Sequence, residues 1–250
     1  MKVKVKHIPE ITKIINSQSA RIEKDCKILA LVNGVELKEV ESWKFFKLNY
    51  YRNQIKFLYA KDNVYRLNKY IIYKWRVYRL INDVEYFTTN RALSIKAYLQ
   101  DMEGNFSKLC ALVYKPLFSD GIDSDGNESD LSYTVTSRME NDFSEMSYTK
   151  VAGAVFFFIQ SFSDFERGFK LDYKRFRDDD DSGNEDPDPL KVMATNYGWW
   201  WTIKVMCDFD PFKEDLIYKW NIRRFYNQLV FMQDMDVVKE KKQFEQLNKK

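Results

Sequence analysis

The chain has 250 residues, of which 45% are hydrophobic and 31% charged, with a formal net charge of +3. This length suits one large domain or two small ones, and the composition is that of a globular protein rather than a disordered one. A net charge of +3 does not by itself predict binding to nucleic acid or to a membrane. The three cysteines are too widely spaced to read as a disulfide framework or a zinc motif. The N-terminus lacks the apolar core of a signal peptide, and the longest apolar run, residues 151–159, is too short to span a bilayer. We therefore expect a cytosolic protein that does not bind membranes.

The first quarter of the chain predicts a helical hairpin. Pro9 suits the first turn of a helix, and apolar residues recur at helical spacing from Ile8 to Val32, before a stop at Asn33-Gly34. A second helix is expected over residues 38–61. We take residues 1–62 as an N-terminal domain and residues 63–250 as the main domain.

The start of the main domain predicts a small β element. β-Branched and aromatic residues over 70–87 surround Asn82-Asp83, which we interpret as a hairpin turn. A helix is then expected through Leu93 and Leu99, and another over residues 107–114, ending before Pro116.

The second half of the chain alternates acidic segments with apolar ones. Residues 119–130 and 178–189 are acidic and are interpreted as loops. Between them we expect a short strand over 133–138 and a helix over 147–165, buried nearly all round. Helices over 190–206 and 213–243 complete the chain. The predicted fold class is therefore mainly α with a small β-hairpin element (α+β), forming an irregular helical domain.

No pattern predicts catalysis. His7 is the only histidine and lies near the N-terminus, where a surface position is the simpler reading, so a catalytic triad and a histidine metal site lack their central residue. The acidic residues before Gly126 do not match a calcium loop, because Gly121 stands where the first ligand is required. The glycines do not form a phosphate-binding loop. We expect no catalytic residue, no metal and no cofactor.

Residues 44–79 combine cations with aromatic side chains. Such a mixture could bind single-stranded nucleic acid, because phosphates attract cations and unpaired bases stack on aromatic rings. The alternative is that the rings pack in the core while the cations form the solvated face of a helix and a hairpin, and we favour this alternative. The candidate nucleic-acid-binding residues are Lys44, Arg52, Lys56, Arg66, Lys74, Arg76 and Arg79. A basic face could also contact the acidic loops or an acidic partner.

A cluster of tryptophans, Trp199, Trp200 and Trp201, follows Gly198. On a helix their side chains point in directions about 100° apart, so at least one must meet another element or a partner. Tryptophan is enriched in the central residues of protein interfaces. The candidate partner-binding residues are Trp199, Trp200, Trp201, Phe212, Phe225 and Phe231.

Three passages resemble the tail and baseplate assembly chaperones of tailed bacteriophages, above all the baseplate-hub assembly proteins of T4-like phages. They are LSIKAYLQD (93–101) with LCALVYKP (109–116), RMENDF (138–143) with VAGAVFFF (151–158), and YGW (197–199) with PFKED (211–215), NQL (227–229) and Glu240. The resemblance covers roughly residues 70–245.

This resemblance implies a late viral protein that acts in the host cytoplasm without active-site chemistry and is absent from the mature virion. Its partners would be baseplate-hub or tail proteins. Two alternatives remain: a structural virion protein of the tail, neck or baseplate, and a single-stranded nucleic-acid-binding protein using the region 44–79. An enzyme is the least expected class, because the carboxylates form no recognisable acid–base pair.

Overall fold

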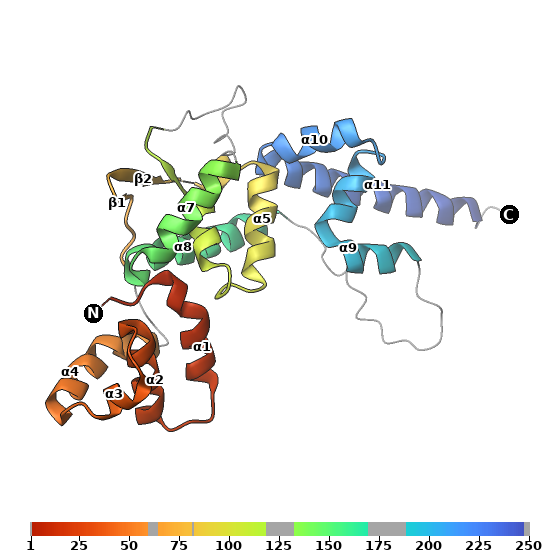
Figure 1. Ribbon diagram of the computed structural model, residues 1–250. Helices are drawn as coiled ribbons and strands as arrows, with labels where there is room; N and C mark the ends of the chain where they lie inside the picture. The colour runs from red at the N-terminus through yellow and green to blue at the C-terminus, as the bar shows by residue number, and fades with distance from the viewer. Residues whose placement is uncertain (1, 60–64, 82, 119–132, 170–188, 248–250) are drawn as a thin grey trace. The chain divides into compact units, whose positions relative to one another are not determined.

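The computed structural model describes residues 2–59, 65–81, 83–118, 133–169 and 189–247. The fold is mainly helical with one small antiparallel sheet, as the sequence predicts (Figure 1). The chain divides into two compact units. Unit 1 comprises residues 1–81, 95–120 and 131–160, and unit 2 comprises residues 82–94, 121–130 and 161–250. The predicted domain boundary at residue 62 lies outside the described residues.

Short helices replace the two long ones predicted at the N-terminus. Their bounds are η1 (Val5–His7), α1 (Ile8–Asn16), α2 (Arg21–Asn33), α3 (Leu37–Glu41), α4 (Phe45–Ile55) and η2 (Lys56–Tyr59). The first predicted helix breaks after Asn16, where Ser17 Oγ donates to the Ile14 carbonyl at 2.8 Å. Such a bond offers the backbone an alternative to the next helical turn. The predicted stop is confirmed, because Gly34 has a φ of 66° and ends α2.

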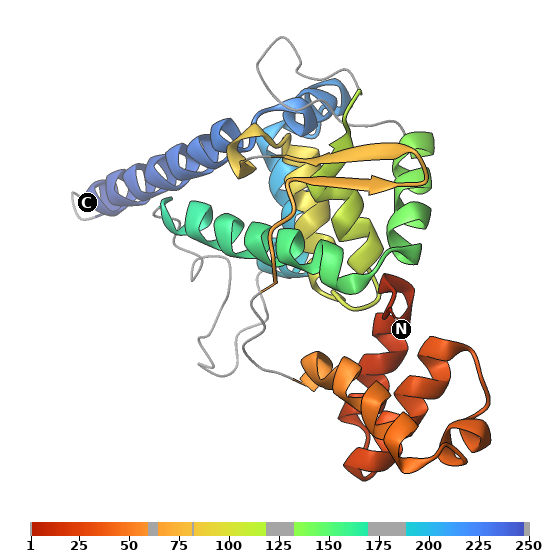
Figure 2. The same ribbon diagram turned by 90° about the vertical axis from the view of Figure 1, so that its left-hand side faces the viewer.

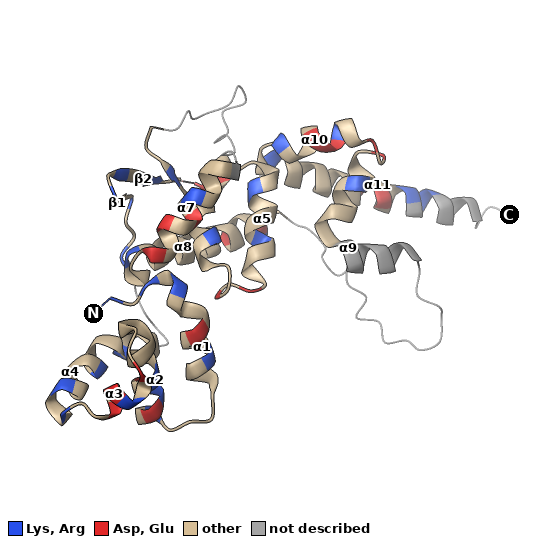
Figure 3. Ribbon diagram, viewed as in Figure 1, with Lys and Arg blue, Asp and Glu red and all other residues tan. Residues whose placement is uncertain are grey.

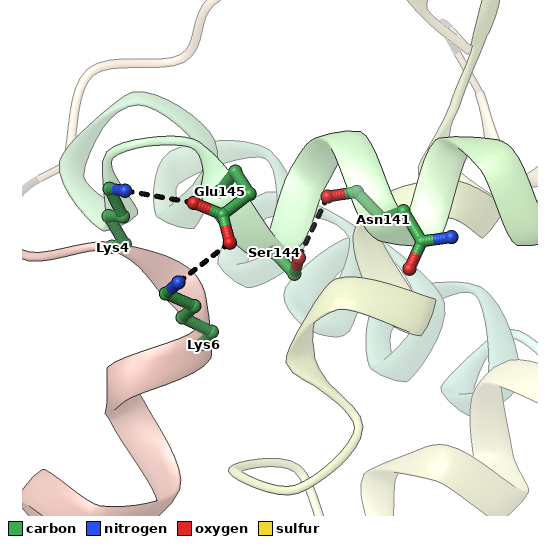
Figure 4. Close-up of polar contacts among 5 residues, drawn as sticks. All are labelled: Lys4, Lys6, Asn141, Ser144 and Glu145. Atoms are coloured by element: carbon green, nitrogen blue, oxygen red, sulfur yellow. Dashed lines mark hydrogen bonds and ion pairs between the residues drawn. The ribbon is translucent and has the colours of Figure 1, made fainter.

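Within unit 1, residues 3–6 contact residues 145–148 through backbone and charged groups. Val5 N–H donates to the Met146 carbonyl at 3.0 Å, and Tyr148 N–H donates to the Val3 carbonyl at 2.8 Å. Lys4 and Lys6 both contact the Glu145 carboxylate, at 2.8 and 2.7 Å (Figure 4). In the preceding turn, Ser144 Oγ donates to the Asn141 carbonyl at 2.7 Å.

The sheet has the order β1-β2-β3, with β1 at Tyr70–Tyr73, β2 at Arg76–Leu80 and β3 at Tyr114–Pro116. All pairings are antiparallel, with Tyr70 opposite Arg79 and Tyr78 opposite Pro116. Figure 2 shows the hairpin of β1 and β2 along its length. The third strand is absent from the sequence prediction.

The predicted position of the hairpin turn is wrong. The turn lies at Lys74 and Trp75, whose φ values are 44° and 66°. Two consecutive positive φ angles suit a tight hairpin turn but are uncommon without glycine, so the sequence carried no turn signal there. Asp83 instead caps the short helix η3 (Val84–Tyr86), accepting from Glu85 N–H at 3.1 Å.

Helices α5 (Thr89–Leu99) and α6 (Phe106–Val113) confirm the two predicted there. The strand predicted over residues 133–138 is wrong, because α7 occupies Tyr133–Glu145. Within α7, Met139 and Phe143 are buried one helical turn apart, which is the spacing of a helix face. The β-branched residues that precede Met139 favour a strand, but the burial of Met139 and Phe143 on one face stabilises a helix instead.

Helix α8 (Tyr148–Arg167) confirms the predicted central helix. Val151, Val155 and Phe158 are buried, whereas Phe156 and Phe157 are 36% and 40% exposed. The prediction that this helix is buried nearly all round is therefore wrong. Its apolar residues occupy more than one face of the helix, and neighbouring elements bury only some of them.

Three helices complete the chain: α9 (Pro189–Met206), α10 (Pro211–Lys219) and α11 (Ile222–Leu247). The helix predicted over 213–243 is divided after Lys219, because Asn221 caps α11 by accepting from Arg223 N–H at 2.8 Å. The acidic loops predicted at 119–130 and 178–189 lie outside the described residues, except Pro189, which begins α9.

Candidate interaction surface

Gly198 divides α9 and positions the tryptophan cluster. Its φ of 51° and ψ of −126° are not helical, so α9 changes direction at this residue. This backbone conformation is essentially restricted to glycine. The three tryptophans therefore begin a new helical segment, which runs to Met206.

The first tryptophan belongs mainly to the core of unit 2. The ring of Trp199 lies 5.9 Å from that of Phe225 and 6.2 Å from that of Tyr226, measured between centroids. Phe225 and Tyr226 are both fully buried. A buried side chain cannot contact a partner while the fold is intact, so Phe225 is removed from the predicted contact surface. Trp199 is only partly exposed.

The other two tryptophans point elsewhere, as helical geometry predicts. The ring of Trp201 packs on that of Phe209, with centroids 5.5 Å apart. Trp200 is 45% exposed, and the Lys204 Nζ lies 4.9 Å from its ring centroid. Of the three, Trp200 is the most exposed.

A compact turn joins α9 to α10. Asp208 and Phe209 both have positive φ, and Asp210 caps α10 by accepting from Phe212 N–H at 2.9 Å. Lys204 on α9 forms a close ion pair with Glu214 on α10. These contacts define how the two helices meet.

Burial, followed by the contact with Glu214, raises the pKa of Tyr218 on α10.

The outer face of α10 carries large apolar side chains. Phe212 is 82% exposed and Leu216 is 59% exposed, one helical turn apart, while Ile217 on the other face is buried. Phe209, in the preceding turn, is 58% exposed. We define the α9–α10 surface as the exposed side chains Trp200, Phe209, Phe212 and Leu216. Sequence reasoning missed Phe209 and Leu216, although Leu216 lies four residues after Phe212, the spacing of one helix face.

The basic candidates of unit 1 divide into two groups. Arg52 Nε contacts buried Asp25 at 2.7 Å, and Arg76 Nη1 contacts buried Asp142 at 2.5 Å. These two arginines neutralise carboxylates of the fold. The remaining candidates lie at the two ends of α4, in the segment before β1 and in the hairpin: Lys44 before α4, Lys56 at the start of η2, Arg66, Lys74 and Arg79.

A small cavity of about 400 Å³ adjoins the hairpin turn in unit 1. Its lining is Trp75, Arg76, Val77, Tyr78, Pro116, Leu117, Phe118, Val135 and Arg138. The described residues of the lining include no carboxylate, histidine or cysteine, so these residues offer no general base and no nucleophile of those kinds. Trp75 and Phe118 are almost fully exposed at its edge.

The described part of the chain shows neither a metal-binding cluster nor a membrane-spanning helix. No cluster of three or more histidine, cysteine or acidic side chains is arranged there to hold a metal ion. None of the helices found there is both long and apolar enough to cross a membrane. Cys26, Cys110 and Cys207 are all buried as free thiols, and burial raises the pKa of Cys110.

Comparison with known proteins adds no relative. No protein-family model matches the chain, and neither the curated proteins nor the solved structures contain a significant match.

Proposed function

We propose that this chain is a non-enzymatic assembly factor that binds another protein through the α9–α10 surface. The observation that carries the proposal is the exposure of Phe212 and Leu216 on one face of α10, with Phe209 exposed in the preceding turn and Trp200 exposed on α9. Exposed apolar side chains grouped in this way are typical of protein-binding sites. Aromatic residues at such sites contribute a large share of binding energy.

The biological setting rests on the sequence resemblance to phage assembly chaperones. We propose baseplate-hub or tail proteins as the partners, the host cytoplasm as the location, and release before the virion matures. Such a factor covers apolar surface on an immature partner and then leaves it. The surface therefore has to bind in one state of the partner and be displaced in another.

The contacts of the basic region favour protein binding over nucleic-acid binding. Arg52 and Arg76 are held by the buried carboxylates of Asp25 and Asp142. A phosphate that recruited either arginine would take the closest cation from a buried carboxylate, which is costly. Single-stranded nucleic acid thus has fewer available cations here than the sequence suggests.

The test is affinity capture of the tagged full-length chain from phage-infected cells, with mass spectrometry of the captured proteins and of purified particles. We expect hub or tail proteins in the capture and none of this chain in the particles. Abundance in the particles would instead make it a structural virion protein. Capture without any hub or tail protein would refute the assembly function.

A paired variant locates the surface. Phe212→Ser combined with Trp200→Ala should reduce capture of the partner at least tenfold, because it removes two aromatic contacts. Phe46→Ser is the matched control, since Phe46 is 86% exposed on α4, comparable with the 82% of Phe212. Circular dichroism would verify that each variant is folded. Equal capture by both variants would remove the α9–α10 surface from the proposal.

A further inference from the structure

The C-terminal half of α11 carries an apolar stripe separate from the α9–α10 surface. Phe231, Met235 and Val238 are 57%, 41% and 44% exposed. Their spacing of four and then three residues places them on one face of the helix. None of the side chains described over residues 231–242 is buried. Figure 2 shows this end of α11 extending beyond the other helices of unit 2.

Charges flank this stripe in an ordered way. At about 100° per residue, Asp234 and Lys241 lie along the same edge of the stripe, two turns apart. Lys242 continues the stripe itself, one turn after Val238. Beside the stripe, Asp234 and Asp236 precede Lys239, Lys241 and Lys242, with Glu240 between the lysines in the sequence; the part of α11 that Figure 3 colours shows red followed by blue here. A helix with this order of charges is complementary to a copy of itself that runs in the opposite direction.

We propose that α11 pairs with α11 of a second copy of this chain, antiparallel, along the Phe231–Met235–Val238 stripe. In this register, Met235 of each copy packs against Val238 of the other. Asp234 of each copy lies beside Lys241 of the other, which forms the same ion pair twice. Phe231 of each copy meets the aliphatic stem of Lys242 from the other, whose ammonium remains in water. The arrangement has a twofold axis, as most homodimers do.

A parallel pair satisfies these side chains less well. It would also bring Asp234 near a cation, Lys239 of the second copy, so that contact does not decide the direction. It would, however, place the two Lys242 side chains opposite each other in the seam. Like charges at a core position of paired helices are destabilising. The antiparallel register avoids this repulsion and adds the apolar contact with Phe231.

The proposed seam is about three helical turns long, which sets its strength. It buries less area than a standard stable interface of roughly 1,200–2,000 Å². We therefore expect a reversible dimer with a dissociation constant in the micromolar range, rather than a permanent one. Self-association of this strength depends on concentration and leaves the α9–α10 surface to other partners.

Sedimentation equilibrium of the full-length chain tests the proposal. We expect a monomer–dimer equilibrium in the wild type. Met235→Lys places two charges in the seam and should raise the dissociation constant at least tenfold. Asp234→Lys should raise it severalfold, and the added change Lys241→Asp should restore it by reversing the ion pair. A monomer at all concentrations would overturn the proposal.

Asp236→Lys is the matched control for Asp234→Lys. It makes the same change of charge on the same exposed helix, but about 130° from the centre of the stripe. It should leave the dissociation constant within twofold of wild type. Equal weakening by both substitutions would show that net charge, not the stripe, controls association.

Cross-linking decides the direction of the pair. Protein carrying Asp234→Cys is mixed with protein carrying either Lys241→Cys or Lys239→Cys, and a short thiol-reactive cross-linker is added. The native cysteines are buried, so the new thiols react first. Antiparallel pairing predicts the 234–241 product in excess. An excess of the 234–239 product would overturn the antiparallel register.

Discussion

The Tyr78 hydroxyl donates a hydrogen bond to the Asp142 carboxylate at 2.5 Å, which ties β2 to α7 in the interior of unit 1. Arg76 Nη1 contacts the same carboxylate oxygen at 2.5 Å. Tyr78 is 1% exposed and Asp142 is 6% exposed. Burial, together with the bond to Asp142, raises the pKa of Tyr78 to about 12. A buried carboxylate is tolerated here because one cation and one hydroxyl satisfy it.

Tyr78→Phe should lower the free energy of unfolding by about 1–2 kcal/mol at neutral pH, because Asp142 loses one hydrogen bond. The pKa of Tyr78 is higher in the folded than in the unfolded chain, so this contribution is complete below about pH 10 and is lost toward pH 12. Urea unfolding should be measured from pH 7 to 12. The difference in the free energy of unfolding between Tyr78→Phe and wild type should become smaller above pH 10. Tyr70→Phe, on the exposed face of β1, is the control. A difference that is constant up to pH 12 would contradict this prediction.

Glu145→Gln should loosen the N-terminal segment. The hydrogen bond from Lys4, followed by that from Lys6, lowers the pKa of Glu145 to about 2. A lowered pKa means that the stabilisation is present above about pH 4.5 and is lost as the pH falls toward 2. Since the carboxylate is partly exposed to solvent, we expect a loss of about 1 kcal/mol or less at pH 7.

Hydrogen exchange measures this effect at the Val5 amide, which donates to the Met146 carbonyl. Exchange at this amide should be faster in Glu145→Gln than in wild type at pH 7. Glu10→Gln is the control, because Glu10 contacts only Lys13 within its own helix among the described ion pairs. Equal exchange rates in both variants would show that the Glu145 contacts do not hold the segment.

Arg52→Ala should destabilise unit 1 by about 2–3 kcal/mol, because it leaves the buried Asp25 carboxylate without its closest cation. The Tyr59 hydroxyl, 2.8 Å from Asp25, and Arg21, at 3.7 Å, would remain and limit the loss. Lys56→Ala, an exposed position on the same stretch of chain, should change stability by less than about 0.5 kcal/mol. Thermal unfolding of the two variants makes the comparison. Equal losses of stability in the two variants would show that Arg52 is a surface cation that nucleic acid could bind.

Helical spacing allowed much of the fold to be predicted from sequence. Helices α5, α6 and α8 follow apolar positions three and four residues apart, and Gly34 ends α2 as expected. The errors arose where tertiary contacts override local preference. The residues that begin α7 favour a strand, but Met139 and Phe143 bury one face of a helix. At the hairpin, Lys74 and Trp75 adopt a turn conformation that neither residue type favours.

The candidate surface was predicted only in part for a related reason. The sequence pattern identified Trp200 and Phe212 as apolar residues with charged residues nearby in the chain. It could not separate Phe225, which is fully buried, from Phe212, which is exposed, because both are phenylalanines on amphipathic helices. Exposure depends on which face of each helix packs inward, and that is decided by contacts between segments far apart in sequence. The pairing of Arg52 with Asp25 is likewise a contact across 27 positions.

Gly198→Ala should destabilise unit 2 by about 1–3 kcal/mol, because a side chain at φ 51° and ψ −126° is strained. Open space around a Cβ at this position excludes a steric clash with neighbours as the cause. Gly198→Asn should be as costly, since the positive-φ conformation that asparagine tolerates is the left-handed helical one, which has a positive ψ. Gly34 lies in that region, with a φ of 66° and a ψ of 35°, so Gly34→Asn should cost less. Chemical unfolding followed by tryptophan fluorescence would compare all three, because Trp199, Trp200 and Trp201 follow Gly198 directly. If asparagine were tolerated equally at both positions, the kink in α9 would not depend on glycine.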